Sequence, residues 1–375
     1  MHLFVDISSH GFGHLAIAAP VLNALAEMAP DFRLTVRSGL PRQKLAQRIR
    51  PPFTLIAGSS DFGYVMIDAT RINLAASAAA YRHAHADWPA TVAREAAWLA
   101  VLKPDLVITN VAYLPLAGAA RLGIPALSLC SLNWADLFAH FFGHEPWAAP
   151  IHGAMLAAYR SARTFLRVTP GMPMHELSNL DAVGPIAAIG QHHDLGLNGN
   201  KAVLIAMGGI DHRLPVDNWP RLPGIRWLVA ADWQCAHPDA IALESFGLSF
   251  TDLLCSVDAV ITKPGYGTFT EAACNGTAVL YQRRDDWPEQ DCLIDWLRGN
   301  ARCLEIAADC LLDGGLAESL RALWRQPPLP RPAATGAAEA AARILGALPA
   351  EGLPEGLTSP LSGSPPAIRN ASRSA

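Results

Sequence analysis

Short runs of apolar, often β-branched residues recur along the chain, and segments with apolar residues at helical spacing follow many of them. A run without polar positions is typical of a strand buried on both faces, as in a parallel sheet. Strands that alternate with helices at this pitch predict parallel sheets covered by helices on both faces. The predicted strands are 3–7, 32–36, 53–56, 104–109, 126–129, 202–206, 227–230, 258–262, 278–281 and 303–306.

The alternation is interrupted in the middle of the chain, which indicates two domains. Between 166 and 200 prolines are frequent and few apolar residues are periodic, so we interpret 166–200 as an interdomain linker. It separates 1–165 from 201–346, and both parts contain strand–glycine turn–helix units. We therefore expect an α/β protein with two Rossmann-like domains that face a cleft. In 347–375 Pro, Gly and Ser dominate without periodicity, which predicts a disordered tail.

One strand–turn–helix unit, 258–271, carries a candidate anion site. The run 258–262 predicts a buried strand, and the sequence Lys263-Pro-Gly-Tyr-Gly267 cannot continue it. Thr268 and Glu271 have the spacing of a capping box, which predicts that a helix begins at Thr268. Such a turn directs free N–H groups and the positive helix end at one spot, and Lys263 adds a full charge there. An ordinary strand-to-helix turn without a ligand has the same residue preferences, so the turn alone leaves both interpretations open.

A second such unit opens the chain, with the sequence Ser-Ser-His-Gly-Phe-Gly-His at 8–14. His14 is predicted to open a helix, where the positive helix end favours the neutral imidazole that can act as a base. Asp136 is a candidate for orienting His14. Because ligands bind outside the carboxyl ends of parallel strands, polar residues that follow predicted strands are expected to line one rim. These residues are His10, His14, Asn110, Asn133, Trp134 and Asp136.

Composition narrows the class of protein. The 375 residues carry a formal net charge of −4 and no basic run, which argues against a nucleic-acid surface. Seven cysteines stand singly without a CxxC pair, which argues against a disulfide framework and a zinc site. The first residues do not resemble a signal peptide, and no apolar run approaches the roughly 20 residues of a membrane span. A soluble, cytoplasmic protein is the expectation.

With these residues in place, the chain resembles nucleotide-sugar glycosyltransferases of the GT-B fold. In the donor-binding signature of the plant members, a His, a Gly, a Ser or Thr and a Glu line the nucleotide. Lys263, Gly265, Thr268 and Glu271 stand at those positions here. The sequence departs from the signature in having Lys263 for the His, Ala278 for a usual Pro, and a slightly longer spacing before its final acidic–Gln pair.

The resemblance implies roles for particular residues. Lys263, Gly267 and Thr268 would contact phosphate, and Glu271 would accept hydrogen bonds from the ribose. The pair Glu289–Gln290 would hold the donor sugar. The full implied donor set is Gly208, Gly209, Lys263, Gly265, Tyr266, Gly267, Thr268, Glu271, Glu289 and Gln290. The implied acceptor-side loop is His10, Gly11, Phe12 and Gly13, with His14 as the general base.

Over 1–345 the sequence is most similar to the glycosyltransferase-like segment of plant L-arabinokinases and its free-standing bacterial relatives. Shared stretches are His-Gly-Phe-Gly-His, Pro-Asp-Leu-Val-Ile-Thr-Asn and Asn-Trp-Ala-Asp. The expected function is transfer of a sugar, with inversion and without a metal or cofactor, from a nucleotide sugar (UDP is the expected nucleotide) to the hydroxyl of an unknown acceptor. Two alternatives remain: a non-catalytic module that binds a nucleotide sugar, and a nucleotide-sugar epimerase of the same fold.

Overall fold

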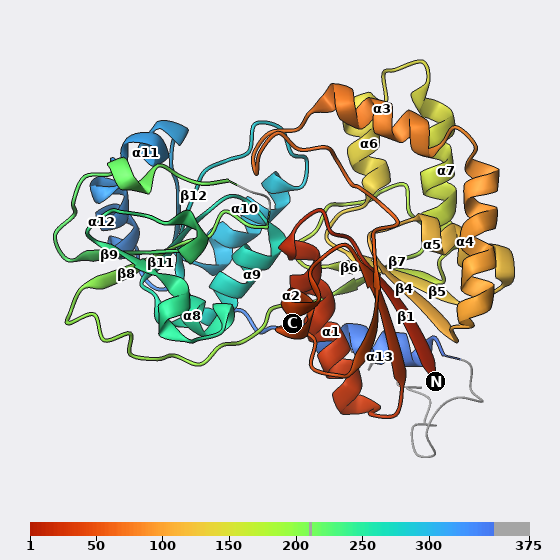
Figure 1. Cartoon of the computed structure of the whole chain (residues 1–375), viewed down its shortest axis with the longest axis horizontal. Helices are drawn as coiled ribbons and strands as arrows, with labels where there is room; N and C mark the ends of the chain where they lie inside the picture. Colours follow the sequence, from red (N-terminus) through yellow and green to blue (C-terminus); the bar gives the residue numbers. More distant parts are fainter. Residues whose placement is uncertain (210–211, 349–375) are drawn as a thin grey trace, which may run out of the picture.

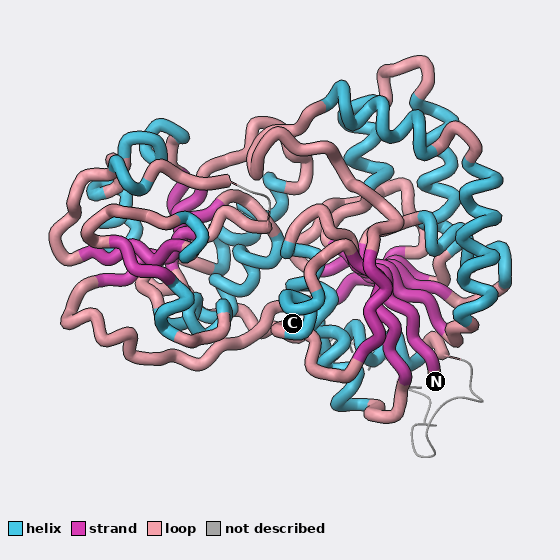
Figure 2. Tube along the Cα trace, viewed as in Figure 1, coloured by secondary structure: helices cyan, strands magenta, loops and turns pink. Residues whose placement is uncertain are grey.

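The computed structural model describes residues 1–209 and 212–348. Figure 1 shows two lobes, one built from the first half of the chain and one from most of the second half. Figure 2 shows that each lobe is centred on its own bundle of strands, with helices packed around it. None of the described helices is long and apolar enough to cross a membrane.

The first sheet has seven described strands in the order β3-β2-β1-β4-β5-β6-β7, and every pairing in it is parallel. Its central strands are buried along their whole length, which explains the uninterrupted apolar runs of the sequence. The strands are β1 His2–Ile7, β2 Arg33–Ser38, β3 Phe53–Ala57, β4 Leu106–Asn110, β5 Ala126–Cys130, β6 Thr164–Val168 and β7 Leu180–Val183.

The second sheet has six described strands in the order β10-β9-β8-β11-β12-β13, again all parallel. Its strands are β8 Lys201–Ile205, β9 Ile225–Val229, β10 Ala240–Ala242, β11 Ala259–Thr262, β12 Ala278–Tyr281 and β13 Cys303–Glu305. The prediction of two Rossmann-like parallel-sheet domains is confirmed.

The α-helices fall mostly in the intervals between the strands. The helices of the first half are α1 Phe12–Met28, α2 Arg42–Ala46, α3 Leu74–Ala84, α4 Trp88–Leu102, α5 Leu114–Leu122, α6 Trp134–Phe142 and α7 Ala148–Ser161. Those of the second half are α8 Phe250–Ser256, α9 Tyr266–Asn275, α10 Gln290–Asn300, α11 Ala308–Asp313, α12 Ala317–Arg325 and α13 Gly336–Gly346.

Three elements depart from the predicted division of the chain. The range 166–200, interpreted as a linker, contains the end of β6 and all of β7, which pairs with β6 and extends the first sheet. Its four residues are too few for a periodic signal to stand out among the prolines. Helix α13 closes the range assigned to the second domain, yet it packs against α1 of the first (Figure 1). Beyond these differences the domain boundaries stay predictions, and the tail from 349 onward lies outside the described residues.

Candidate functional site

Each sheet changes its winding direction at one pair of neighbouring strands, β1 with β4 in the first sheet and β8 with β11 in the second. Crevices for ligands form outside the carboxyl ends of strands at such switch points. The turn at 8–11 follows β1, and Asn110 ends β4. In the second sheet, Gly208 and Gly209 follow β8, and Lys263 follows β11. Most of the predicted site residues therefore lie at the two switch points.

The two switch points meet across the domain interface, because the first turns of α1 and α9 are in contact. A Cβ atom at Gly267 would lie 2.7 Å from the Cβ of Ala16 and 3.5 Å from the Cα of Gly13, so this approach requires glycine. Phe12 similarly lies against Gly209. Two helix N-termini, each with a partial positive charge, thus converge on one region.

The caps of these two helices differ from the prediction. Helix α9 begins at Tyr266 with Gly265 as its N-cap, and α1 begins at Phe12 with Gly11 as its N-cap; neither cap residue makes a side-chain cap hydrogen bond. The predicted capping box from Thr268 to Glu271 is therefore wrong. The glycine turn allows the helix to start two residues earlier, and the carboxylate of Glu271 has another partner. Neither helix end is satisfied by a capping side chain, which leaves its N–H groups available to an anion.

His14 is buried and is hydrogen-bonded to Asn110, with 2.7 Å between Nδ1 and Oδ1. The amide of Asn110 is itself oriented, because its Nδ2 donates to the carbonyl of Leu129 at 2.9 Å. The Oδ1 atom therefore accepts from Nδ1–H of His14, and Nε2 keeps its lone pair. Burial lowers the pKa of His14 to about 4, so the ring is neutral at physiological pH.

Asp136 is not brought to His14. Its backbone N–H donates to the side chain of Asn133 in the first turn of α6. Burial raises the pKa of the Asp136 carboxyl, and the charged groups that act on it are Glu176, His152 and His175. The residue that orients His14 is Asn110, which the sequence placed on the rim without giving it a partner.

His10 lies in an aromatic cluster between the domains. Its ring stacks on Trp287, with centroids 5.7 Å apart and an interplanar angle of 6°, and meets Trp134 edge-on at 5.3 Å. Burial lowers the pKa of His10 well below its ordinary value, and the nearby charges of His14, Arg284 and Lys263 lower it further. The cluster thus gathers several groups that are cationic when protonated.

Lys263 stands at the switch point of the second sheet. Its Nζ makes no ion pair with any residue in the described ranges 1–209 and 212–348. Burial, followed by the charge of Arg284, lowers the pKa of Lys263 to about 7. Gly208, with φ at +96°, leaves room beside the ammonium group, since a Cβ there would lie 3.5 Å from Nζ. A half-buried cation that has no ion-pair partner among the described residues favours an anionic ligand.

Arg284 is a second cation at this site, and the sequence gave it no role. Its guanidinium lies over the ring of Trp287 at 3.8 Å and is buried, and its Nε and Nη2 have no hydrogen-bond partner among the described residues. Burial lowers its pKa to about 10, although Glu289 and Asp68 raise it in part. The signal available in the sequence was its place in 282–290, directly after a predicted strand.

Glu289 and Gln290, expected to hold a sugar, fix the loop after β12. Glu289 accepts from Ser131 Oγ of the other domain at 2.5 Å and from Trp287 Nε1 at 3.0 Å. Gln290 Oε1 accepts from the backbone N–H of Arg284 at 3.0 Å, and its Nε2 donates to the carbonyl of Arg284 at 3.3 Å. The pair therefore positions Arg284 and Trp287, and its predicted sugar contact is untested.

Glu271, expected to bind ribose, is engaged across the domain interface. Both of its oxygens accept from the guanidinium of Arg48, and the longer of the two contacts, Nη2 to Oε2, is 3.1 Å. Its side chain is almost fully buried, whereas that of Arg48 is one-fifth exposed. This ion pair ties α9 to the loop that follows α2, and the ribose role stays a prediction.

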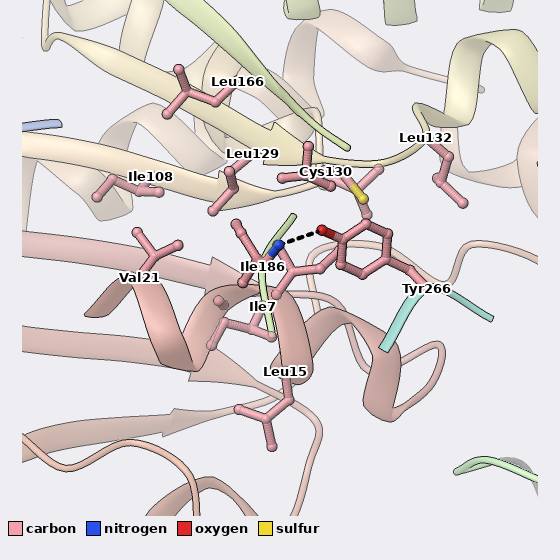
Figure 3. Close-up of a cluster of buried hydrophobic side chains, with 14 of the residues drawn as sticks. Ile7, Leu15, Val21, Ile108, Leu129, Cys130, Leu132, Leu166, Ile186 and Tyr266 are labelled. Carbon is pink, nitrogen blue, oxygen red and sulfur yellow. Dashed lines mark hydrogen bonds between the residues drawn. The ribbon is translucent and has the colours of Figure 1, made fainter. Parts of the chain in front are cut away.

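Tyr266 also joins the domains. Figure 3 shows its ring among apolar side chains of the first domain, including Leu15 and Leu132. Its hydroxyl accepts from the backbone N–H of Ile186 at 2.9 Å and donates to the carbonyl of Thr169 at 3.1 Å. Tyr266 therefore fixes the position of the α9 turn against the first domain.

Other parts of the described chain bear on the chemistry. A cavity of about 220 Å³ lies past the carboxyl ends of β9 and β10, lined by residues that include Ala230, Gln234 and Cys235. No group of three or more His, Cys, Asp or Glu side chains that could hold a metal ion occurs within the described residues.

Comparison with known proteins identifies the fold. No family model matches the chain. It is 24% identical over 316 residues to L-arabinokinase of Arabidopsis thaliana, a match that covers 78% of this chain and 29% of that protein. The chain thus spans less than a third of the length of this curated relative.

Solved structures match over nearly the whole chain. The kitacinnamycin glycosyltransferase superposes with a TM-score of 0.61 at 16% identity, covering 93% of this chain and 99% of that one. Glycosyltransferase VinC in complex with dTDP superposes with a TM-score of 0.55 at 18% identity, covering 92% of this chain and 95% of that one. A protein from Listeria monocytogenes assigned as a UDP-N-acetylglucosamine 2-epimerase superposes with a TM-score of 0.57 at 14% identity, covering 92% of this chain and 95% of that one. These likenesses show that the chain has the GT-B fold.

Proposed function

Starting from the GT-B fold, we propose that this protein transfers a sugar from a nucleotide sugar to an acceptor hydroxyl. The observation that carries the proposal is the meeting of two uncapped helix N-termini beside the unpaired ammonium of Lys263. A diphosphate is the common sugar-activating group whose charge matches this arrangement. The glycosyltransferases among the structural neighbours, one of them in complex with dTDP, support this assignment.

The charge at the site serves the leaving group. When the bond between the anomeric carbon and the diphosphate oxygen breaks, the electron pair leaves with the diphosphate. Lys263 and the N-termini of α1 and α9 neutralise this growing charge in a site with little water, where fixed dipoles are most effective. We assign the nucleobase to the cavity of about 220 Å³ beyond β9, the neighbour of β8 in the sheet.

His14 is proposed to take the proton. Its Nε2 lone pair receives the acceptor's hydroxyl proton while the hydroxyl oxygen bonds to the anomeric carbon, on the face opposite the diphosphate, so the configuration inverts. An imidazole with a pKa of about 4 is a weak base. A bound diphosphate stabilises the imidazolium, which raises this pKa toward the working pH.

The test is to measure binding and turnover separately on the full chain. UDP and UDP-sugars are expected to raise the melting temperature, and a UDP-release assay is expected to detect transfer or slow donor hydrolysis. If a UDP-sugar binds but neither UDP release nor conversion of its sugar is detected, the non-catalytic module is favoured. The partial match with L-arabinokinase also points to that alternative. Conversion of a UDP-sugar to its epimer would favour the epimerase, as the Listeria neighbour suggests. If no nucleoside diphosphate binds, the proposal is wrong.

A further inference from the structure

Three buried polar atoms that have no hydrogen-bond partner among the described residues lie over the ring of one residue, Trp287. They are Nε2 of His10 and Nε and Nη2 of Arg284. Buried polar groups in folded proteins are nearly always paired, so a cluster of exceptions calls for an explanation. A ligand with oxygen atoms would satisfy all three.

No carboxylate among the described residues forms an ion pair with Arg284. Glu289 is the carboxylate with the largest effect on it, but one of its oxygens accepts from Ser131 and the other from Trp287. The Arg284 backbone is held at both its N–H and its carbonyl by Gln290, so the side chain is presented from a fixed position. A buried guanidinium that is fixed but unpaired is costly to the fold, unless a bound anion compensates it.

Arg284 lies near Lys263, whose pKa its charge lowers, but the two residues follow different strands. Lys263 follows β11 and lies beside the N-cap of α9, whereas Arg284 follows β12, one strand further along the sheet. Trp287 is buried, and its ring contacts both His10 and the Arg284 guanidinium, so it holds these two groups in place. The geometry therefore places Arg284 beside the sugar of a nucleotide sugar that is bound at the switch point.

We propose that the transferred sugar is a sugar acid, whose carboxylate is bound by the guanidinium of Arg284 over Trp287. This inference rests on the proposed function and names its substrate class. A planar guanidinium matches a carboxylate with two parallel hydrogen bonds, a pairing that a neutral sugar cannot supply. A neutral sugar would leave the buried charge uncompensated, so discrimination is expected to be strong.

The test compares UDP, UDP-glucose and UDP-glucuronate, which differ stepwise by a sugar and by one carboxylate. By isothermal titration, wild type is expected to bind UDP-glucuronate at least tenfold more tightly than UDP-glucose. Arg284→Gln is expected to abolish this preference and to leave the affinity for UDP within about twofold. Arg284→Lys keeps the positive charge but loses the planar group that can donate two parallel hydrogen bonds. This variant is expected to retain only part of the preference for UDP-glucuronate. Arg283→Gln is the matched control, because Arg283 pairs with Asp291 and Glu305 instead.

The outcomes separate this inference from the proposed function. If wild type binds UDP but binds UDP-glucose and UDP-glucuronate equally tightly, the inference of a sugar acid is wrong and the proposed function is unaffected. If Arg284→Gln weakens UDP as much as UDP-glucuronate, the guanidinium belongs to the diphosphate and the inference is wrong. Absence of binding for all three compounds would overturn both proposals. Circular dichroism and melting curves on each variant establish that the altered affinities come from folded protein.

Discussion

The strand–turn–helix units that contain α1 and α9 are built alike, yet they leave their titratable groups in opposite conditions. In the first, His14 is hydrogen-bonded to Asn110, whose own amide is fixed by Leu129. In the second, Lys263 has no counter-ion among the described residues, and its pKa is lowered to about 7. The first unit thus holds a neutral imidazole, whereas the second holds a cation without a partner among the described residues. The two units leave their titratable groups in different states, because different residues pack against them.

The largest expected effect comes from the first turn. His14→Ala is expected to reduce turnover by roughly 10²–10⁴-fold, the usual contribution of a positioned base. Nucleotide affinity is expected to stay nearly unchanged, because the ammonium and the α9 helix end remain. His144→Ala, at an exposed position on the same domain, is the control. UDP release and isothermal titration measure the two quantities, and unimpaired turnover in His14→Ala would remove the residue from the mechanism.

The ion pair between Arg48 and Glu271 tests whether the second turn is held by the first domain. Arg48→Ala leaves Glu271 buried without a partner, and the expected cost is about 3 kcal/mol of unfolding free energy, at the low end for a buried pair because Arg48 is partly exposed. Arg50→Ala breaks an exposed pair with Glu27 and is expected to cost about 0–1 kcal/mol. Chemical denaturation measures both.

The same variant separates two roles of Glu271. If the carboxylate serves only the domain interface, nucleotide affinity in Arg48→Ala stays within about twofold of wild type at a temperature where the variant is folded. Tighter binding would show that Arg48 competes with the ribose for Glu271, and would support the role implied by the family resemblance.

Removing the ammonium group of the second turn is expected to weaken UDP binding. Lys263→Ala is expected to weaken the free energy of UDP binding by about 1.5–3 kcal/mol, the net contribution of a hydrogen bond to a charged group. Wild-type affinity should also fall as pH rises through about 7, because free Lys263 loses its proton there while the diphosphate keeps the bound form protonated. Lys201→Ala, at the amino end of β8, is the control. An unchanged affinity across this pH range would contradict the assignment.

The smallest expected effect sharpens the role of Asn110. In Asn110→Asp a carboxylate faces Nδ1 of His14, and opposite charge stabilises the imidazolium, so the pKa of His14 rises from about 4. The acidic limb of the pH–rate profile, where activity is lost as the ring gains a proton, should move to higher pH. A limb that stays in place would show that Asn110 does not act through His14. Melting curves establish that the variant is folded.

Several features could be predicted from the sequence because they depend on neighbours along the chain. Apolar periodicity identified the strands that form the centres of both sheets, and the glycine turns identified α1 and α9. Parallel topology then placed Lys263 and His14 at carboxyl strand ends, since crossover connections force all strands to point the same way. The strands β6, β7 and β10 and the earlier start of α9 were missed, because strands of three to five residues give little periodicity and a glycine N-cap gives no side-chain signal.

The tertiary structure alone decided which partner each of these residues has. Glu271 pairs with Arg48 from the other domain, and His14 pairs with Asn110 instead of Asp136. Burial of a charged residue has no signal in the local sequence; it sets the low pKa of Lys263. The packing also leaves Arg284 without a counter-ion among the described residues. The sequence determined which groups reach the rim of each sheet. Their charge states depend on distances between segments up to 223 residues apart, which only packing of the two domains defines.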